Sequence, residues 1–204
     1  MPKESSRRHE FGDEGLLKAE LEYITQTAFQ ANEDRARVSS FYLVAVGSLV
    51  AAVFSTQFVS QDIPPSLIDW AFTVLFFVLT ILGTLTTLQL ARLRAAWHDS
   101  MRAMNQLKDY WIRHSSDIHL KEAFRWDTAS LPPRHKTNSV SYYQALEVAL
   151  LSGLTFGAGV YFLQQAMAYS CATCNWAYAV AFGLLACLVQ LILYKRNLGD
   201  ENAS

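Results

Sequence analysis

The chain has 204 residues, of which 51% are hydrophobic and only 17% are charged, and its formal net charge is −1. A typical soluble domain has about a quarter of its residues charged. This composition excludes a disordered chain, a collagen-like repeat and a small disulfide-rich scaffold, and it gives no support to nucleic-acid binding.

Charged residues are concentrated at the two ends and in a central stretch, and they leave long apolar runs between them. A helix needs about 20 mainly apolar residues to cross the hydrocarbon core of a bilayer, which is about 30 Å thick. We therefore predict an all-α fold, an integral membrane four-helix bundle with spans at 39–59, 67–91, 143–166 and 175–194. The alternative is a soluble helical bundle with an unusually apolar core, although soluble helices carry a polar stripe.

These spans divide the chain into five regions. They are a cytoplasmic N-terminal helix at 1–38, a first transmembrane hairpin at 39–91, a cytoplasmic helical segment with a Pro-containing loop at 92–142, a second transmembrane hairpin at 143–194 and a cytoplasmic tail at 195–204. We expect no cleaved signal peptide, because the first apolar run follows a long charged segment.

The positions of the basic residues predict how the chain is oriented. Of the 17 Lys and Arg residues, six precede the first span, nine lie between the second and third, and two follow the fourth. Basic residues near span ends stay in the cytoplasm, so both termini are expected inside the inner (plasma) membrane. The basic residues expected at the membrane surface are Arg35, Arg37, Arg92, Arg94, Lys195 and Arg196.

Aromatic rings near the span ends, which favour the headgroup level, include Trp70, Tyr142, Tyr143, Tyr169, Trp176 and Tyr194.

The N-terminal segment predicts a helix that continues into the first span. Its apolar residues recur mostly at spacings of three and four, which places them on one helical face: Leu17, Leu21, Ile24, Ala28, Ala31 and Val38. A second such face continues the second span as far as about His114: Leu90, Leu93, Trp97, Met101, Met104, Leu107 and Trp111. We expect the two extensions to pack antiparallel in a coiled-coil-like stalk. The alternative for the Met and Trp residues is a cofactor pocket, but we expect no cofactor.

The rest of the central segment carries weaker signals. Ser115 and its neighbours can cap a short helix that ends at Phe124, and the prolines at 132–133 predict a loop over 131–136. The stretch 141–144, Ser-Tyr-Tyr-Gln, matches a capping box at the start of the third span.

Small residues at intervals of four mark several spans. They are Gly47, Ala51 and Ser55 in the first, Ala149, Gly153 and Gly157 in the third, and Gly183 in the fourth. Such residues let helix backbones approach closely in lipid. The pattern fits packing of the four helices within one chain, a subunit interface in a homo-oligomer, or both.

Glu147 is the deepest charged residue of the third span. An intramembrane carboxylate is costly and often serves as a proton or cation relay, which makes Glu147 the candidate for a transport site. The alternative is an interfacial carboxylate at the helix N-terminus. Gln144, Gln164 and Gln190 are the polar residues that could accompany it.

Cys171 and Cys174 lie in the second outer loop, where a cysteine pair can form a disulfide or exchange electrons. The layout resembles the membrane thiol oxidases of the DsbB type, which have four spans with both termini inside. Those enzymes use two outer cysteine pairs, whereas the loop at 61–66 has no cysteine. A structural or inert pair is the alternative.

No metal site and no catalytic residue is predicted. His114 and His119 do not have the spacing of a zinc signature, and the sequence contains no phosphate-binding loop, nucleophile elbow or HExxH motif.

In outline the chain resembles the short membrane effectors of bacterial defence systems, including SLATT-type proteins, which pair cytoplasmic helices with typically two spans. We therefore predict a non-enzymatic, oligomeric multi-pass membrane protein. It would act as a membrane effector, a channel-like subunit or a signal-transmitting module, with its cytoplasmic helices available to a protein partner. The alternatives are a small secondary transporter that uses Glu147 and, third, a thiol–disulfide oxidoreductase that uses Cys171 and Cys174.

Overall fold

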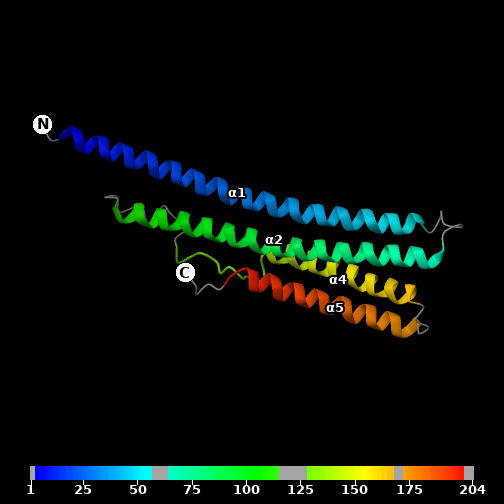
Figure 1. Cartoon of the computed structure of the whole chain (residues 1–204). Coiled ribbons are helices and arrows are strands. Elements are labelled where there is room, and N and C mark those ends of the chain that lie inside the picture. Colours follow the sequence, from blue (N-terminus) through cyan, green and yellow to red (C-terminus); the bar gives the residue numbers. More distant parts are fainter. Residues whose placement is uncertain (1–2, 57–63, 115–127, 168–171, 200–204) are drawn as a thin grey trace. The chain divides into compact units, whose positions relative to one another are not determined.

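The computed structural model describes residues 3–56, 64–114, 128–167 and 172–199, and within these ranges all regular structure is helical. Four helices follow one another along the chain (Figure 1): α1 (Lys3–Thr56), α2 (Pro65–His114), α4 (Val140–Ala166) and α5 (Ala172–Asn197). The prediction of an all-α chain with four long apolar helices is confirmed, because each helix is long and apolar enough to cross a membrane. The short helix predicted to end at Phe124 lies outside the described residues.

The two longest helices continue well beyond the predicted spans. α1 has 54 residues and α2 has 50, which at 1.5 Å per residue gives lengths of about 80 and about 75 Å. No proline interrupts either helix after its first turn, so nothing in the backbone forces a break. α2 ends at His114, the residue at which its apolar periodicity was predicted to end.

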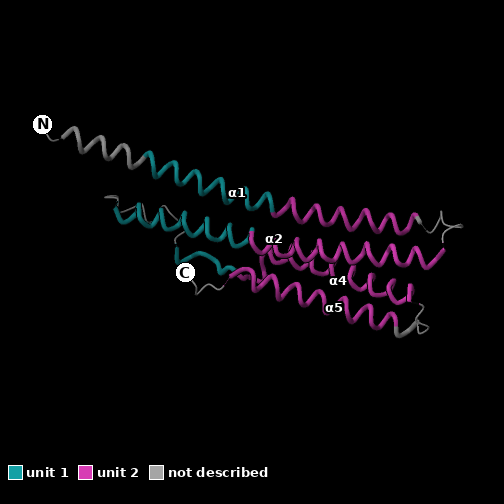
Figure 2. The backbone as a smooth tube through the Cα atoms, in the orientation of Figure 1, with its two compact units in different colours: residues 1–34, 93–134 teal, residues 35–92, 135–204 magenta. Residues whose placement is uncertain are grey.

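The chain divides into two compact units, and α1 and α2 contribute to both (Figure 2). Unit 1 contains residues 1–34 and 93–134, and unit 2 contains residues 35–92 and 135–204. In unit 1, the buried apolar residues of α1 are Ile24, Ala28 and Ala31, which lie on the predicted face. On α2, the predicted apolar face is only partly buried between Leu93 and Leu107, and the fully buried residues of this stretch are polar.

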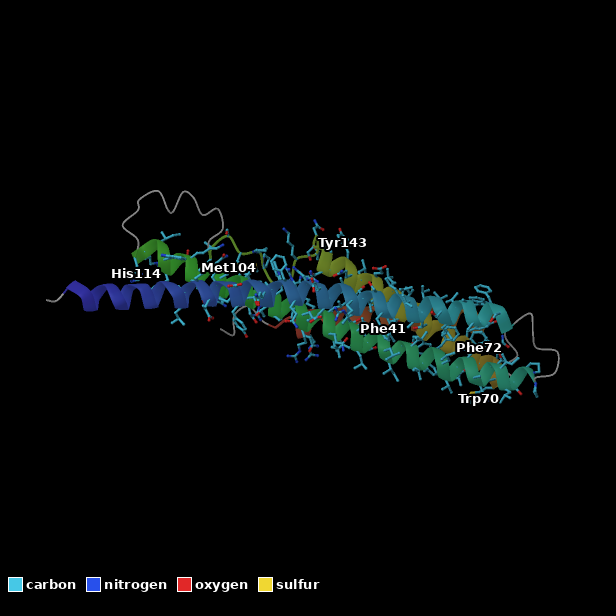
Figure 3. All side chains as sticks on the ribbon, turned by 90° about the horizontal axis from the view of Figure 1, so that it is seen from above. Phe41, Trp70, Phe72, Met104, His114 and Tyr143 are labelled. Atoms are coloured by element: carbon cyan, nitrogen blue, oxygen red, sulfur yellow. The ribbon has the colours of Figure 1, made fainter. Side chains whose placement is uncertain are left out.

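Unit 2 has an apolar core with large apolar residues on its outside as well. The core is formed by residues of all four helices, including Tyr42, Leu79, Leu90 and Val148. Apolar side chains also project outward along unit 2, and Phe41 and Trp70, which Figure 3 labels, are 69% and 44% exposed. Soluble monomers rarely expose large apolar patches, and exposed apolar side chains of this kind are consistent with a helix bundle that faces lipid.

α4 and α5 lie side by side (Figure 1). Their backbones approach closely because glycines face the partner helix. A Cβ atom added to Gly153 would lie 2.7 Å from the carbonyl oxygen of Gly183, and one added to Gly157 would lie 2.7 Å from that of Ala179. These two glycines therefore set the distance between the helices.

The N-terminus of α4 differs from the sequence prediction. The capping residue is Ser139, whose backbone is extended (φ −128°, ψ 149°) and whose hydroxyl accepts a hydrogen bond from the Tyr142 N–H. The capping box predicted at 141–144 is therefore wrong. Ser141 already lies inside the helix, and its buried hydroxyl accepts a hydrogen bond from the Arg35 guanidinium.

Candidate functional site

A row of threonines lies on one face of α2, inside unit 2. Thr80, Thr84 and Thr87 follow at spacings of four and three, which places them on one face of the helix. Each hydroxyl donates to the carbonyl oxygen four residues earlier, at 2.9 to 3.0 Å. This bonding is common where a hydroxyl is shielded from water, and it leaves the threonine oxygens available as acceptors.

Gln190 of α5 joins this row to α4. Its side chain is 3% exposed, and its amide nitrogen donates to the hydroxyls of Thr84, at 3.2 Å, and of Ser152. Its amide oxygen lies 3.3 Å from the Thr87 hydroxyl, whose single proton is shared between this oxygen and the Gly83 carbonyl oxygen. One side chain thus connects α2, α4 and α5 with three hydrogen bonds.

Two residues of α4 complete the polar side of the cluster. Ser152, which is fully buried, donates to the Thr80 carbonyl oxygen at 3.3 Å. The Oγ1 atoms of Thr155 and Thr80 lie 3.1 Å apart. The α2–α4 contact is therefore polar over a full helical turn, although both helices are long and apolar enough to cross a membrane.

Tyr42 of α1 places its side chain next to these polar residues of α2 and α4. Its side chain is 1% exposed, and its hydroxyl lies beside the hydroxyls of Ser152 and Thr155. The ring reaches this position because Gly83 has no side chain: a Cβ there would lie 2.5 Å from the Tyr42 hydroxyl and 2.6 Å from the Ser152 hydroxyl. We call Tyr42, Thr80, Gly83, Thr84, Thr87, Ser152, Thr155 and Gln190 the polar cluster.

The chemistry of the polar cluster is that of neutral hydroxyls and one amide. It contains no carboxylate, no basic group and no imidazole, so it has no group suited to general acid–base work near neutral pH. No group of three or more His, Cys, Asp or Glu that could hold a metal occurs among the described residues. Hydrogen bonds of this kind connect helices in membranes and contribute about 0.6 kcal/mol each on average. The cluster can therefore fix the rotation and register of the helices around it.

The sequence analysis predicts Gln190 only as a polar residue that could accompany Glu147, and it does not include the threonine row. The structure separates the two residues: Glu147 is exposed on α4 and does not belong to the polar cluster. Gln144 and Gln164 are half-buried, and the buried Oε1 atom of each has no partner among the described residues. The detectable signal was the three-and-four spacing of the threonines, combined with the single amide in the otherwise apolar run of α5.

The small residues divide into two groups. Gly153, Gly157 and Gly183 lie in the contact between α4 and α5, and Ala149 is fully buried. Gly47, Ala51 and Ser55 are exposed on α1, and a Cβ added to Gly47 would meet nothing within 4 Å. The first group thus packs within the chain, whereas the α1 group is exposed in the part of the chain that the structure describes.

The cysteine pair falls at the limit of the described residues. Cys171 lies outside them, and Cys174 belongs to the first turn of α5 without a described side chain. Cys187 is a free, buried thiol.

The basic residues named for the membrane surface occupy different environments. Arg37, Arg92, Lys195 and Arg196 are exposed, and Arg35 contacts Ser141 as described above. Arg94 is 6% exposed within unit 1, where its Nε donates to the Arg134 carbonyl oxygen at 3.5 Å and its guanidinium lies 4.5 Å from the centre of the Trp97 ring.

His98, one turn after Arg94, is a buried titratable group of unit 1 with a perturbed pKa. Its Nε2 atom lies 3.2 Å from the Pro132 carbonyl oxygen, and its Nδ1 atom lies 3.9 Å from the Asp99 carboxylate. Burial lowers the pKa of His98 below its ordinary value of 6.5, and the positive charge of Arg134 lowers it further. The ring therefore holds the segment after Pro132 against α2 best when it is neutral.

Comparisons with known proteins give no relative for this chain. No family model, no curated protein and no solved structure matches it.

Proposed function

We propose that this protein is a non-enzymatic, four-span membrane protein that acts as an effector, a channel-like subunit or a signal-transmitting module. In this proposal both termini and the segment at 92–142 are cytoplasmic, and the helical extensions of α1 and α2 meet a cytoplasmic partner. Support for membrane insertion comes from the four helices of sufficient length and hydropathy and from the exposed apolar surface of unit 2. Support for the orientation comes from the basic residues.

The observation that carries the proposal is the continuity of α2. This single helix begins in the apolar sequence at Pro65 and ends in charged sequence at His114. Its length of about 75 Å is more than twice the thickness of a hydrocarbon core. In this proposal the continuous helix passes a rotation or shift from its apolar end to its charged end, because no proline interrupts it after its first turn.

The polar cluster suits a module of this kind better than an enzyme. Its hydrogen bonds hold the membrane part of α2 in a defined rotation against α4 and α5. Because the polar cluster is neutral, a second arrangement of the helices would not bury a charge. A switch requires an element with two discrete arrangements.

The test is a break in α2 just beyond the first hairpin. Ala96 is exposed, so Ala96→Pro changes the backbone without removing a packed side chain, at a cost of about 3 kcal/mol to the helix. Ala96→Gln keeps the helix and serves as the control. In cells, induced wild-type chain is expected to change the membrane potential, as reported by a potential-sensitive dye. Ala96→Pro should abolish the change at an equal membrane level, and Ala96→Gln should preserve it.

Two results together would contradict this proposal. They are an unchanged membrane potential at every level of induction and a purified protein that is strictly monomeric by cross-linking in membranes. A protein of this class acts through assembly or through a change in permeability, and such a chain would show neither.

A further inference from the structure

Five exposed basic residues gather at one end of unit 2. They belong to α1, α2, α5 and the segment that leads into α4: Arg37, Arg92, Lys136, Lys195 and Arg196. Within the described part of the chain, none of the five forms an ion pair. We call these five residues the basic belt.

Contacts with the first turn of α4 fix the level of the basic belt on α1 and α5. The Arg35 guanidinium donates to the Ser141 hydroxyl, and the Tyr194 hydroxyl donates to the Ser141 carbonyl oxygen at 3.5 Å. Arg37 lies two residues after Arg35, and Lys195 directly follows Tyr194. Both cations are therefore close to the level at which α4 begins.

α2 reaches the same level from the opposite direction, because it runs antiparallel to α4 (Figure 1). A Cβ added to Gly83 would lie 2.6 Å from the Ser152 Cβ, so these two residues are level with each other. Arg92 follows Gly83 by nine residues, about 14 Å, and Ser141 precedes Ser152 by eleven residues, about 17 Å. Arg92 thus lies within about one helical turn of Ser141 along the bundle.

The acidic residues of the described part of unit 2 are not members of the basic belt. Asp69 lies near the start of α2, at the other end of the unit, and Glu147 is the eighth residue of α4. On α1, Glu33 and Asp34 precede Arg37 by one turn, on the side away from the apolar sequence. The basic belt therefore presents five positive charges where the apolar part of the bundle ends.

The helix faces that carry these cations continue into exposed apolar side chains. Residues four or seven apart lie on one face of a helix. Three such pairs join a cation of the basic belt to an exposed apolar residue: Arg37 with Phe41, Arg92 with Leu85, and Arg196 with Ile192. In each pair the apolar residue lies toward the span and the cation toward the charged sequence. This order matches a phospholipid, whose hydrocarbon adjoins its phosphate, whereas a soluble acidic protein would leave the apolar residues uncovered.

We propose that the basic belt binds the phosphate groups of anionic phospholipids in the adjacent leaflet. This inference depends on the proposed membrane insertion and adds a lipid class as a partner of the inserted chain. Each Lys or Arg near a membrane surface favours an anionic lipid by about fivefold in affinity. The guanidinium groups of the three arginines can also bind a phosphate through two parallel hydrogen bonds.

The test uses the full-length chain reconstituted in phosphatidylcholine bilayers with a small fraction of spin-labelled lipid. Electron paramagnetic resonance separates lipid held against the protein from free lipid, and it gives the ratio of the association constants of phosphatidylglycerol and phosphatidylcholine. At about 0.1 M salt we expect a ratio between about two and about five, because one cation contributes about fivefold and lipids of the other leaflet dilute the effect. At about 1 M salt, where the Debye length is about 3 Å, the ratio should approach one.

Arg37→Glu with Arg92→Glu replaces two positive charges of the basic belt with two negative ones and should bring the ratio close to one. The matched control is Lys18→Glu with Arg113→Glu, which makes the same change of charge on the same two helices. Lys18 and Arg113 are exposed and lie 19 and 21 residues from Arg37 and Arg92. These separations are about 30 Å of helix, beyond the Debye length of about 10 Å at 0.1 M salt. The control should keep the wild-type ratio, and circular dichroism should show an equal helix content in both variants.

Three results would overturn the inference. The first is a wild-type ratio of one, or a ratio that does not respond to salt. The second is an equal fall in both variants, which would assign the effect to overall charge. The third is a wild-type ratio that persists in Arg37→Glu with Arg92→Glu. A chain that does not float with the lipid is not inserted, and that result, which is seen before any spectrum is recorded, overturns the proposed function itself.

Discussion

Gly83 is the residue on which the interior of unit 2 depends most directly. The absence of a side chain lets the Tyr42 ring and the Ser152 hydroxyl reach the same turn of α2. Neither neighbour is the far end of a flexible surface chain, since both residues are at most 1% exposed. Interiors are packed at the density of organic crystals, so even one added methyl group has no space here.

The Gly83→Ala substitution should therefore destabilise the protein by about 1–3 kcal/mol, which is the usual cost of overpacking. The measurement is unfolding of the detergent-solubilised protein in increasing sodium dodecyl sulfate. Gly47→Ala is the matched control, because its new Cβ meets nothing within 4 Å and Ala is the better helix former by about 1 kcal/mol. Equal destabilisation by the two variants would show that Gly83 is not in the contact described.

A substitution of Gln190 tests the hydrogen bonds of the polar cluster rather than its packing. Gln190→Leu removes three bonds but leaves the threonine hydroxyls bonded to their own backbone. We expect a loss of about 1–2 kcal/mol in the same unfolding measurement, at about 0.6 kcal/mol for each bond. Gln89→Leu, at an exposed position of α2, should have no measurable cost. A loss at Gln190 no larger than at Gln89 would contradict a role for the cluster in helix packing.

At the scale of elements, the contact of the segment after Pro132 with α2 depends on pH. Because the folded pKa of His98 is lowered, the unfolded chain binds a proton at about pH 6.5 while the folded chain does not. This contribution to stability is complete above pH 6.5 and is lost as the pH falls from 6.5 through the lower folded pKa. Arg94 and Arg134 oppose protonation, and Asp99 and the Pro132 carbonyl favour it, but burial has the largest effect.

We therefore expect the urea midpoint of unit 1, followed by tryptophan fluorescence, to fall between pH 7.5 and 5.5. In His98→Gln the fall should be smaller, because the amide does not titrate. His114→Gln should behave like the wild type, since His114 is exposed at the end of α2. An equal response to pH in all three proteins would assign the effect to other groups.

The same elements show how far the sequence could predict this structure. Periodicity and apolar length located all four helices, including the end of α2 at His114. The start of α4 was misplaced because Ser139 and Ser141 are both good capping residues, and only the backbone conformation distinguishes them. The polar cluster was missed because hydroxyls lower the hydropathy of a span only slightly. Whether a threonine faces lipid or another helix depends on tertiary contacts. These contacts cannot be predicted from the sequence of one helix alone.

For the whole molecule, the distribution of polar and apolar groups favours an environment of lipid. Unit 2 encloses Ser152, Thr87 and Gln190, whereas leucines, valines and phenylalanines are exposed on its outside. In water this arrangement would expose a large apolar surface, at a cost of about 25 cal/mol for each Å². In a bilayer the same surface is solvated, and the buried hydroxyls find partners that lipid does not offer.

The proposed orientation rests on the distribution of charge and is open to direct measurement. In this proposal four crossings place residue 204 on the same side as residue 1, and the basic residues at 92–136 and 195–196 favour the cytoplasm for that side. A green fluorescent protein fused after Ser204 should be fluorescent, because it folds in the cytoplasm, and an alkaline phosphatase fused there should be inactive. The opposite pattern should appear for fusions after Asp62, which the sequence predicts to lie in the first outer loop. Phosphatase activity at Ser204 would require an odd number of crossings or a reversed orientation, and either would remove the cytoplasmic extensions on which the proposed function depends.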